Sequence, residues 1–391
     1  MMNQEDLFSG TENPPRSPSP EILPAHVHRI RDYVLSELPS DLSAVSRQEM
    51  TYRGLADKQC RILEEAGAGA FPVDDLAAAR VTQLDLLFML NGYLPVGPEA
   101  FPRPLVDAVT AQCARHPSLD PHMSYELLID VNSEQWQRHG HMRVFSEGEL
   151  GRLERDFYLG HHLTEPAVRT AYDRLCSSLS EPPSDDLAHS MDEAFRKLDE
   201  FRLGMARYGR LTREQFNSFR RYHMGHQGGP RGASGAFMPS VQLLELVLVP
   251  PTEEYEVYLD QSMPYFPTWS RELIAERRAM SAQGENITQA VLDGRLKLDQ
   301  ESATALLGVF DKFTDFRMVH LGVTRKMIPE AFAGTGGTTR RDIAAQSGER
   351  TVLADENPGT SGFDVRNVLT NAVYRLLAAR QEIEDFHAAA V

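Results

Sequence analysis

The stretch LLGVFDKFTDFRMVHLGVTRKM, residues 306–327, decides how the rest of the chain is interpreted. Its large apolar side chains recur every three, four or seven residues, which is the spacing of one face of an α-helix. The members of this stripe are Leu306, Val309, Phe310, Phe313, Phe316, Val323 and Met327. At about 100° per residue, His320 falls in the same stripe, one turn after Phe316. The pattern therefore predicts a helix with a histidine at the centre of its apolar face.

A histidine in that position has two explanations. It is either a core residue that is hydrogen-bonded to a backbone carbonyl, or a ligand offered to a large apolar cofactor. The glycine-rich stretch GTGGTT, residues 334–339, follows one short turn later and suits the second explanation, because glycine lets a backbone approach a ligand closely. On spacing alone, the ordinary core histidine is the more frequent case.

Composition restricts the class of protein. The chain has 391 residues, of which 41% are hydrophobic, so it can bury a substantial core as one large domain or two ordinary ones. Its net charge of −16, from 40 basic against 56 acidic residues, argues against binding to nucleic acid or to an anionic membrane. Three scattered cysteines form neither a disulfide framework nor a zinc ribbon. Without a signal peptide or a membrane-spanning run, we expect a cytoplasmic protein.

The order of patterns along the chain predicts an all-α fold. Residues 1–24 form a Pro/Ser-rich tail that we expect to be disordered, residues 25–145 an N-terminal helical region, and residues 146–391 a second helical region. Separate helices are predicted over 147–158 and 165–180. The run VQLLELVLV, residues 241–249, fits a buried strand or a buried helix equally well. Almost no alternation of period two occurs elsewhere.

Several common chemistries do not fit. GTGGTT follows a predicted helix and lacks the Gly-Lys-Ser/Thr of a phosphate-binding loop, and no G-x-S-x-G or H-E-x-x-H motif is present. The histidine pairs are predicted to be solvated or loop residues and not metal ligands, because no third ligand stands at a recognisable spacing. These pairs are His139 with His141, His161 with His162, and His223 with His226.

Three motifs together resemble a known family. FRMVH at 316–320, GTGGTT at 334–339 and GASGAFMPSVQLLELVL at 232–248 are similar to the haem-ligand helix, substrate loop and distal glycine loop of tryptophan and indoleamine 2,3-dioxygenases. These enzymes belong to the histidine-ligated haem-dependent aromatic oxygenases. Within them, the monodechloroaminopyrrolnitrin synthase branch is most similar, since Met238, Pro239, Leu244 and Glu245 match its Met-Pro and Leu-Glu. The resemblance covers roughly residues 120–380.

The resemblance implies an all-helical fold in which residues 146–391 bind haem b through its iron and residues 25–145 contribute to the distal pocket. His320 would be the proximal ligand, and Phe316 and Arg317 would contact the cofactor, with Arg317 near a propionate. Ser234 and Gly235 would lie on the distal face, where they could support bound oxygen. The loop residues that would close over the substrate are Thr335, Gly336, Gly337 and Thr338.

The chain departs from the family at three points. Gln242 stands where tryptophan dioxygenases carry an arginine for the substrate carboxylate, so simple tryptophan ring cleavage is not the first expectation. A second glycine loop at 359–362, with Thr360 and Ser361, competes with GTGGTT for the substrate role. No distal histidine stands out, and the candidates are His122, His139 and His141.

With the resemblance, haem ligation becomes the favoured explanation for His320. The expected function is that of an enzyme, a haem b-dependent oxygenase that oxidises an indole or other aromatic amino-acid derivative with dioxygen or peroxide in secondary metabolism. The alternatives are a haem or small-molecule sensor of the same fold without turnover, a tryptophan 2,3-dioxygenase, and a structural helical protein in which His320 is a core residue. Assembly into a homo-oligomer is left open.

Overall fold

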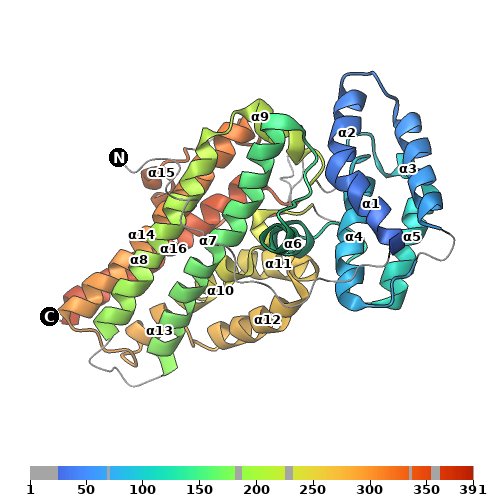
Figure 1. The fold of residues 1–391 in the computed structure, drawn as a ribbon. Helices are drawn as coiled ribbons and strands as arrows, with labels where there is room; N and C mark the ends of the chain where they lie inside the picture. The colour runs from blue at the N-terminus through green and yellow to red at the C-terminus, as the bar shows by residue number, and fades with distance from the viewer. Residues whose placement is uncertain are drawn as a thin grey trace. The chain divides into compact units, whose positions relative to one another are not determined.

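The computed structural model is helical throughout (Figure 1). It describes residues 25–67, 71–180, 187–224, 232–333, 337–353 and 362–390, so the tail predicted to be disordered lies outside the described residues. Among the described residues there is no β-strand, and the only extended pairing is an isolated bridge between Leu353 and Phe363. The all-α prediction is confirmed.

The described residues divide into two compact units. Residues up to 123 and from 127 to 158 form the first, and residues 124–126 and from 159 onward form the second. The helices of the first unit, with η marking 3-10 or π turns, are α1 (Ala25–Ser36), α2 (Leu38–Ser46), α3 (Tyr52–Ala66), α4 (Leu76–Asn91), η1 (Pro98–Ala100), α5 (Arg103–Arg115), η2 (Glu126–Val131), α6 (Asn132–His139) and the start of α7 (Gly148–Ser180).

The second unit contains the remainder of α7 and all later elements. These are α8 (Leu187–Ala206), η3 (Arg207–Arg210), α9 (Arg213–Arg220), η4 (Gly235–Phe237), α10 (Pro239–Leu248), α11 (Glu253–Ser262), η5 (Met263–Tyr265), α12 (Thr268–Ala282), α13 (Ile287–Leu292), α14 (Gln300–Met327), η6 (Pro329–Phe332), α15 (Arg340–Ala344) and α16 (Val365–Ala390). The second unit carries every described residue of the predicted haem and substrate sites. That the first unit contributes to a ligand pocket stays a prediction.

One prediction about helix boundaries was wrong. The two helices expected at 147–158 and 165–180 are a single helix, α7, of 33 residues with Pro166 inside it. A proline removes only one intrahelical donor, here the one to the carbonyl of His162, and α7 continues through that position. The break predicted between residues 158 and 165 is therefore absent.

The predicted central helix is confirmed as α14. Asp299 caps its first turn by accepting from the Ser302 amide at 2.8 Å, and Arg325 and Lys326 lie in its last turn, where cations suit the helix dipole. It lies side by side with α8 and α16 (Figure 1). Phe316 contacts Phe201 of α8 with ring centroids 4.4 Å apart, which buries the apolar stripe.

The ambiguous run at 241–249 is α10, a helix whose ten residues are all buried. Pro239 occupies its first turn, where the missing N–H costs nothing. A helix that is apolar all round belongs in the interior, but this one also carries Gln242 and Glu245. Buried polar and charged groups need partners, so these two residues direct attention to what surrounds α10.

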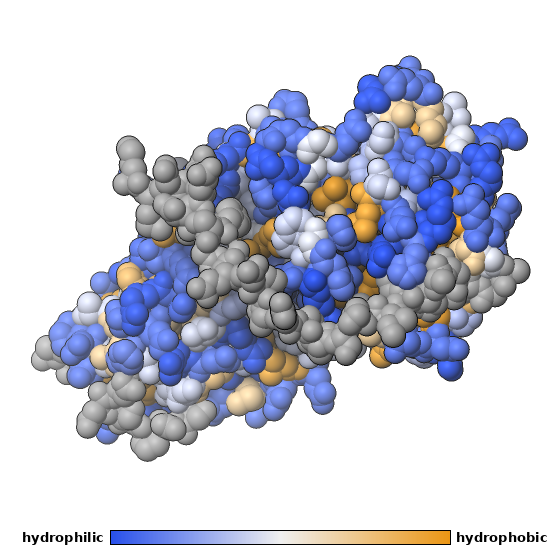
Figure 2. Space-filling view, in the orientation of Figure 1, coloured by the Kyte–Doolittle hydropathy of each residue, from blue (hydrophilic) through white to orange (hydrophobic). Residues whose placement is uncertain are grey.

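The face drawn in Figure 2 is mostly polar outside the grey residues. Apolar residues occur on it in small groups. No described helix is long and apolar enough to cross a lipid bilayer.

In the first unit, Glu154 predicts a pH-dependent stability. Its carboxylate is completely buried and accepts from the amides of Phe145 and Ser146 at 2.9 and 3.0 Å and from the Tyr158 hydroxyl. Burial is the largest effect and raises the pKa of Glu154 to about 7. Between about pH 4.5 and about pH 7, the folded protein therefore keeps a proton on Glu154 that the unfolded chain has released. Because of this difference, the free energy of unfolding falls by on the order of 3 kcal/mol as the pH rises through that range.

The measurement is urea unfolding of the wild type and of Glu154→Gln at about pH 5 and about pH 8. From about pH 5 to about pH 8, the free energy of unfolding of the wild type should fall relative to that of the variant, because glutamine cannot titrate. Parallel pH dependence in the two proteins would show that Glu154 keeps an ordinary pKa.

Candidate functional site

His320 lies in the last third of α14 on the face shared with Phe316 and Arg317. Its ring stacks obliquely on Phe316, with centroids 6.0 Å apart. The side chain is partly exposed, yet Nδ1 is enclosed and has no hydrogen-bond partner among the described residues. Burial, followed by the charges of Arg317 and His161, lowers the pKa of His320 to about 3. The imidazole is therefore neutral near pH 7 and keeps a lone pair for a ligand.

The expectation for His161 was wrong, because this residue is helical and buried. It belongs to α7 and is only 4% exposed. Its ring stacks on Tyr208 with centroids 5.0 Å apart, and its Nδ1 lies 3.1 Å from the Tyr208 hydroxyl. The clue in the sequence was helical spacing, which places His161 one turn after buried Tyr158.

A third histidine, His223, is also buried, just after α9. Burial lowers its pKa to about 3, helped by the charges of Arg220 and His161. Because His161 acts on the pKa of both His223 and His320, the three imidazoles belong to one neighbourhood of the second unit. They do not form a three-ligand metal site, since no such group of His, Cys, Asp or Glu occurs within the described residues. His226, its predicted companion, lies outside them.

The structure brings the distal glycine turn beside His161. Ser234 Oγ accepts from the Ala236 amide at 3.2 Å, which closes η4. A Cβ atom on Gly235 would lie 3.2 Å from His161 Nε2, so the bare backbone of Gly235 packs on that imidazole. That Ser234 and Gly235 support bound oxygen stays a prediction.

Gln242 holds this turn in place. Its Nε2 donates to the Ala236 carbonyl at 3.1 Å and to the Tyr258 hydroxyl at 3.3 Å, while its Oε1 accepts from the Tyr255 hydroxyl at 2.7 Å. Tyr258 itself donates to the Ala236 carbonyl at 2.7 Å. The amide of Gln242 thus has partners at both ends within the protein. That Gln242 contacts a substrate stays a prediction.

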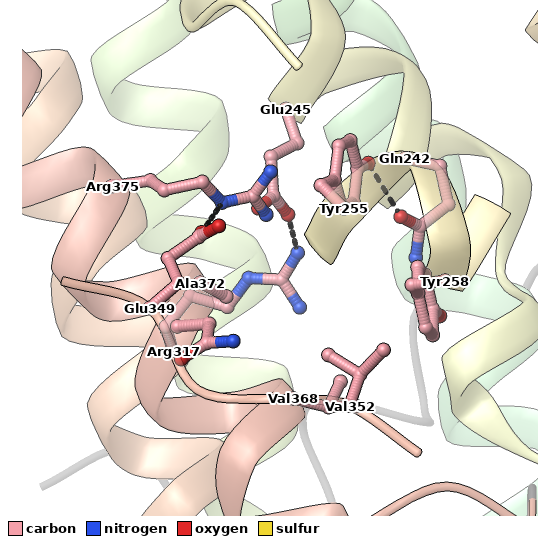
Figure 3. Close-up of a pocket in the computed structure, with 11 residues that line it drawn as sticks. Gln242, Glu245, Tyr255, Tyr258, Arg317, Glu349, Val352, Val368, Ala372 and Arg375 are labelled. Carbon is pink, nitrogen blue, oxygen red and sulfur yellow. Dashed lines mark hydrogen bonds and ion pairs between the residues drawn. The ribbon is translucent and has the colours of Figure 1, made fainter. Parts of the chain in front are cut away.

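Glu245 belongs to a buried cluster of four charged side chains (Figure 3). Glu245 is 1% exposed and forms ion pairs through its two oxygens with Arg317 of α14 and Arg375 of α16. Arg375 Nε also lies 3.0 Å from Glu349 Oε1, and its guanidinium lies 3.8 Å from the centroid of the Tyr255 ring. Two cations and two anions make the cluster neutral, so each buried charge has a counter-charge, as the burial of charge requires.

The space beside this cluster is small. A cavity of about 20 Å³ is lined by the charged residues together with Gln242, Tyr255, Tyr258, Val352, Val368, Asn371 and Ala372. This volume suits about one water molecule. Within the described residues, Arg317 Nε and Arg375 Nη1 have no acceptor, so a water bound there would have donors to meet it.

The two predicted substrate loops are only partly described. Thr335, Gly336, Thr360 and Ser361 lie outside the described residues. Thr338 accepts from Arg325 of α14 at 3.0 Å, and Gly337 packs against the Asp342 carboxylate, where a side chain would clash. The flanks of the second loop are joined by a hydrogen bond from the Asp364 amide to the Val352 carbonyl at 3.0 Å, next to the charge cluster.

The remaining histidine candidates belong to the first unit. His139 is the last residue of α6, and His122 and His141 flank the same region of the chain. Whether any of them faces His320 stays a prediction.

Gly160 should be required for the His161–Tyr208 pair. A Cβ atom at this α7 position would overlap the hydroxyl oxygen of Tyr208. Because that ring is buried, we expect Gly160→Ala to displace it and to cost about 1–3 kcal/mol of stability. Denaturant unfolding of the second unit measures the loss.

Gly322→Ala is the matched control, since Gly322 is also helical but has open space around its Cβ position. It should raise stability by up to about 1 kcal/mol, because alanine favours helix. Equal effects of the two substitutions would contradict the steric argument.

Comparison with known proteins does not assign the chain to a family. No family model matches the chain, and no curated protein matches it significantly.

Proposed function

We propose that this protein is a haem b-dependent oxygenase that acts on an indole or other aromatic amino-acid derivative, with His320 as the axial ligand. The observation that carries the proposal is the environment of His320: a partly exposed imidazole on an apolar helix face, with an enclosed Nδ1 that has no partner among the described residues. Neutral imidazole is a common axial ligand of haem iron.

The packing around His320 supports its proposed role as the residue that would hold the haem. Phe316 packs on the His320 ring and restricts its rotation, as an axial ligand requires. A haem bound there would supply the redox chemistry with dioxygen or peroxide, which no amino-acid side chain can provide. Arg317 does not enter the proposal as a cofactor ligand, because its guanidinium already pairs with Glu245.

The other residues would serve binding and proton handling. Gly235, packed on His161, would bring a bare backbone to the distal side, with Ser234 next to it. His161 holds a hydrogen bond with Tyr208 and so has one ring nitrogen already oriented. Either the first glycine loop, with Thr335, Gly336, Gly337 and Thr338, or the second, with Thr360 and Ser361, would close over the aromatic substrate and exclude water.

Haem titration of the purified protein tests the first half of the proposal. A Soret band that saturates at one haem per chain, and that shifts when carbon monoxide is added after reduction, is the expected result. A protein that stays colourless with excess haem would favour the structural alternative, in which His320 is a core residue.

Turnover tests the second half. Aerobic incubation of the haem-loaded protein with tryptophan, chlorotryptophan and tyrosine, with a reductant or with peroxide, should yield an oxygen-dependent product from at least one of them. N-formylkynurenine from tryptophan would identify the dioxygenase alternative, and a Soret band without any product would favour the sensor alternative.

A further inference from the structure

The charge cluster around Glu245 lies one helical turn from His320. Arg317 precedes His320 by three residues on α14, so the two side chains project from the same face. The Arg317 guanidinium lies over the Phe313 and Phe316 rings, at 5.1 and 5.6 Å from their centroids. Phe316 in turn stacks on His320. Contacts therefore run without a break from Glu245 through Arg317 and Phe316 to His320.

Glu245 determines where Arg317 can be. Each of its two oxygens serves an arginine from a different helix, so one carboxylate ties α10 to both α14 and α16 (Figure 3). Arg317 is only 7% exposed on its side chain, and a charge so deeply buried is held by its counter-charge. Arg317 also lies over the Phe316 ring, and that ring stacks on the His320 imidazole. A change in the Glu245–Arg317 pair should therefore be felt at the imidazole.

The resemblance places Arg317 near a haem propionate, but the observed contacts of Arg317 do not fit that role. One Arg317 Nη already pairs with Glu245 in the buried cluster, and the adjoining cavity of about 20 Å³ has room for one water but not for a carboxylate group. At the paired Nη, a haem propionate would have to displace Glu245 and leave its carboxylate buried without this arginine. The cluster is already neutral, so a further anion would unbalance it.

We propose that Glu245 is a positioning residue for His320 and acts through Arg317. In this arrangement Arg317 is bound by Glu245 and not by a haem propionate. The inference deepens the proposed function, since it concerns the residue proposed as axial ligand. Its first test uses the protein without haem and so does not depend on that function.

The first test follows the imidazole nitrogens of His320 by ¹⁵N NMR in haem-free protein. Assignment comes from comparison with His320→Gln. Glu245→Gln and Arg317→Gln should each shift or split the His320 ring signals. Combining the two should give less than the sum of their shifts, because both act through one contact. Where Glu245→Gln does not fold, Arg317→Lys and Arg317→Gln serve together: lysine keeps the charge and should move the signals less than glutamine.

Arg375→Gln is the matched control. It removes the other arginine of the same carboxylate, from an equally buried position, but leaves the Glu245–Arg317 pair intact. We expect the His320 ring signals to stay unchanged in this variant. If Arg375→Gln moves them as far as Glu245→Gln does, the cluster is a general stabiliser of the fold and the positioning role is refuted.

The second test compares haem with haem dimethyl ester, which lacks free carboxylates. We expect Arg317→Gln to weaken the binding of both by the same factor, on the order of tenfold, because supporting residues of a metal ligand typically have effects of that size. Weakening confined to haem would show that Arg317 binds a propionate and would overturn this half of the inference. If the wild type binds neither compound, the proposed function fails while the NMR experiment still decides the role of Glu245.

Discussion

Replacing His320 by glycine is expected to abolish histidine ligation of haem, and added imidazole is expected to restore it. The substitution removes the imidazole from the apolar face of α14 and leaves a space of its own shape next to Phe316. A free imidazole can enter such a space, because the site is partly exposed and the Phe316 ring would stack on it. The spectrum of the haem-loaded variant should lose the wild-type Soret position and regain it as imidazole is titrated.

His189→Gly is the control for this experiment. His189 is an exposed histidine of α8, so its replacement carries a similar helix penalty of about 1 kcal/mol without touching the proposed site. Its haem spectrum should match the wild type with or without imidazole. A His320→Gly variant that keeps the wild-type spectrum would mean that another residue, such as His161 or His223, holds the iron.

The sequence was sufficient for the helix that carries His320, because its evidence is local. A regular apolar stripe, the cap at Asp299 and the basic last turn all lie within one continuous segment, and α14 follows them from Gln300 to Met327. The same reasoning failed between residues 158 and 165, where two helices were predicted and α7 is continuous with Pro166 inside it. It left α10 undecided, since a short run of buried residues has no face by which to tell helix from strand.

The partners of the site could not be predicted in the same way. Glu245 lies 72 residues from Arg317 and 130 residues from Arg375, and no spacing rule connects positions so far apart. What the sequence does contain is an anomaly: a glutamate inside VQLLELVLV. An ionised group in an apolar run is almost never buried unless it is paired, so its presence predicts a partner but does not say which. His161 was missed for a related reason, because a histidine pair was taken as solvated without regard to its helical phase.

The same anomaly occurs in the first unit, where Asp85 interrupts the apolar run of α4. We expect Asp85→Leu to destabilise this unit by about 3–5 kcal/mol, because it leaves Arg143 as an unpaired buried charge. Asp85 and Arg143 are each 1% exposed, and the arginine approaches the two carboxylate oxygens at 2.7 and 3.2 Å. Asn132 fixes the backbone of Arg143 by accepting from its amide and donating to its carbonyl, both at 2.9 Å. The side chain therefore cannot easily turn outward to water. Urea unfolding of the purified protein measures the effect.

The double substitution Asp85→Leu with Arg143→Met separates the cost of unpaired charge from the cost of lost packing. It removes both charges, so most of the stability lost in Asp85→Leu should return, as is found when buried ion pairs are replaced by apolar residues of similar volume. Arg103→Met is the matched surface control, because the Arg103–Asp107 pair on α5 is exposed and should contribute no more than about 1 kcal/mol. If the double variant is as unstable as Asp85→Leu alone, the loss comes from the shape of the α4 interior, and the buried charge of Arg143 is not its cause.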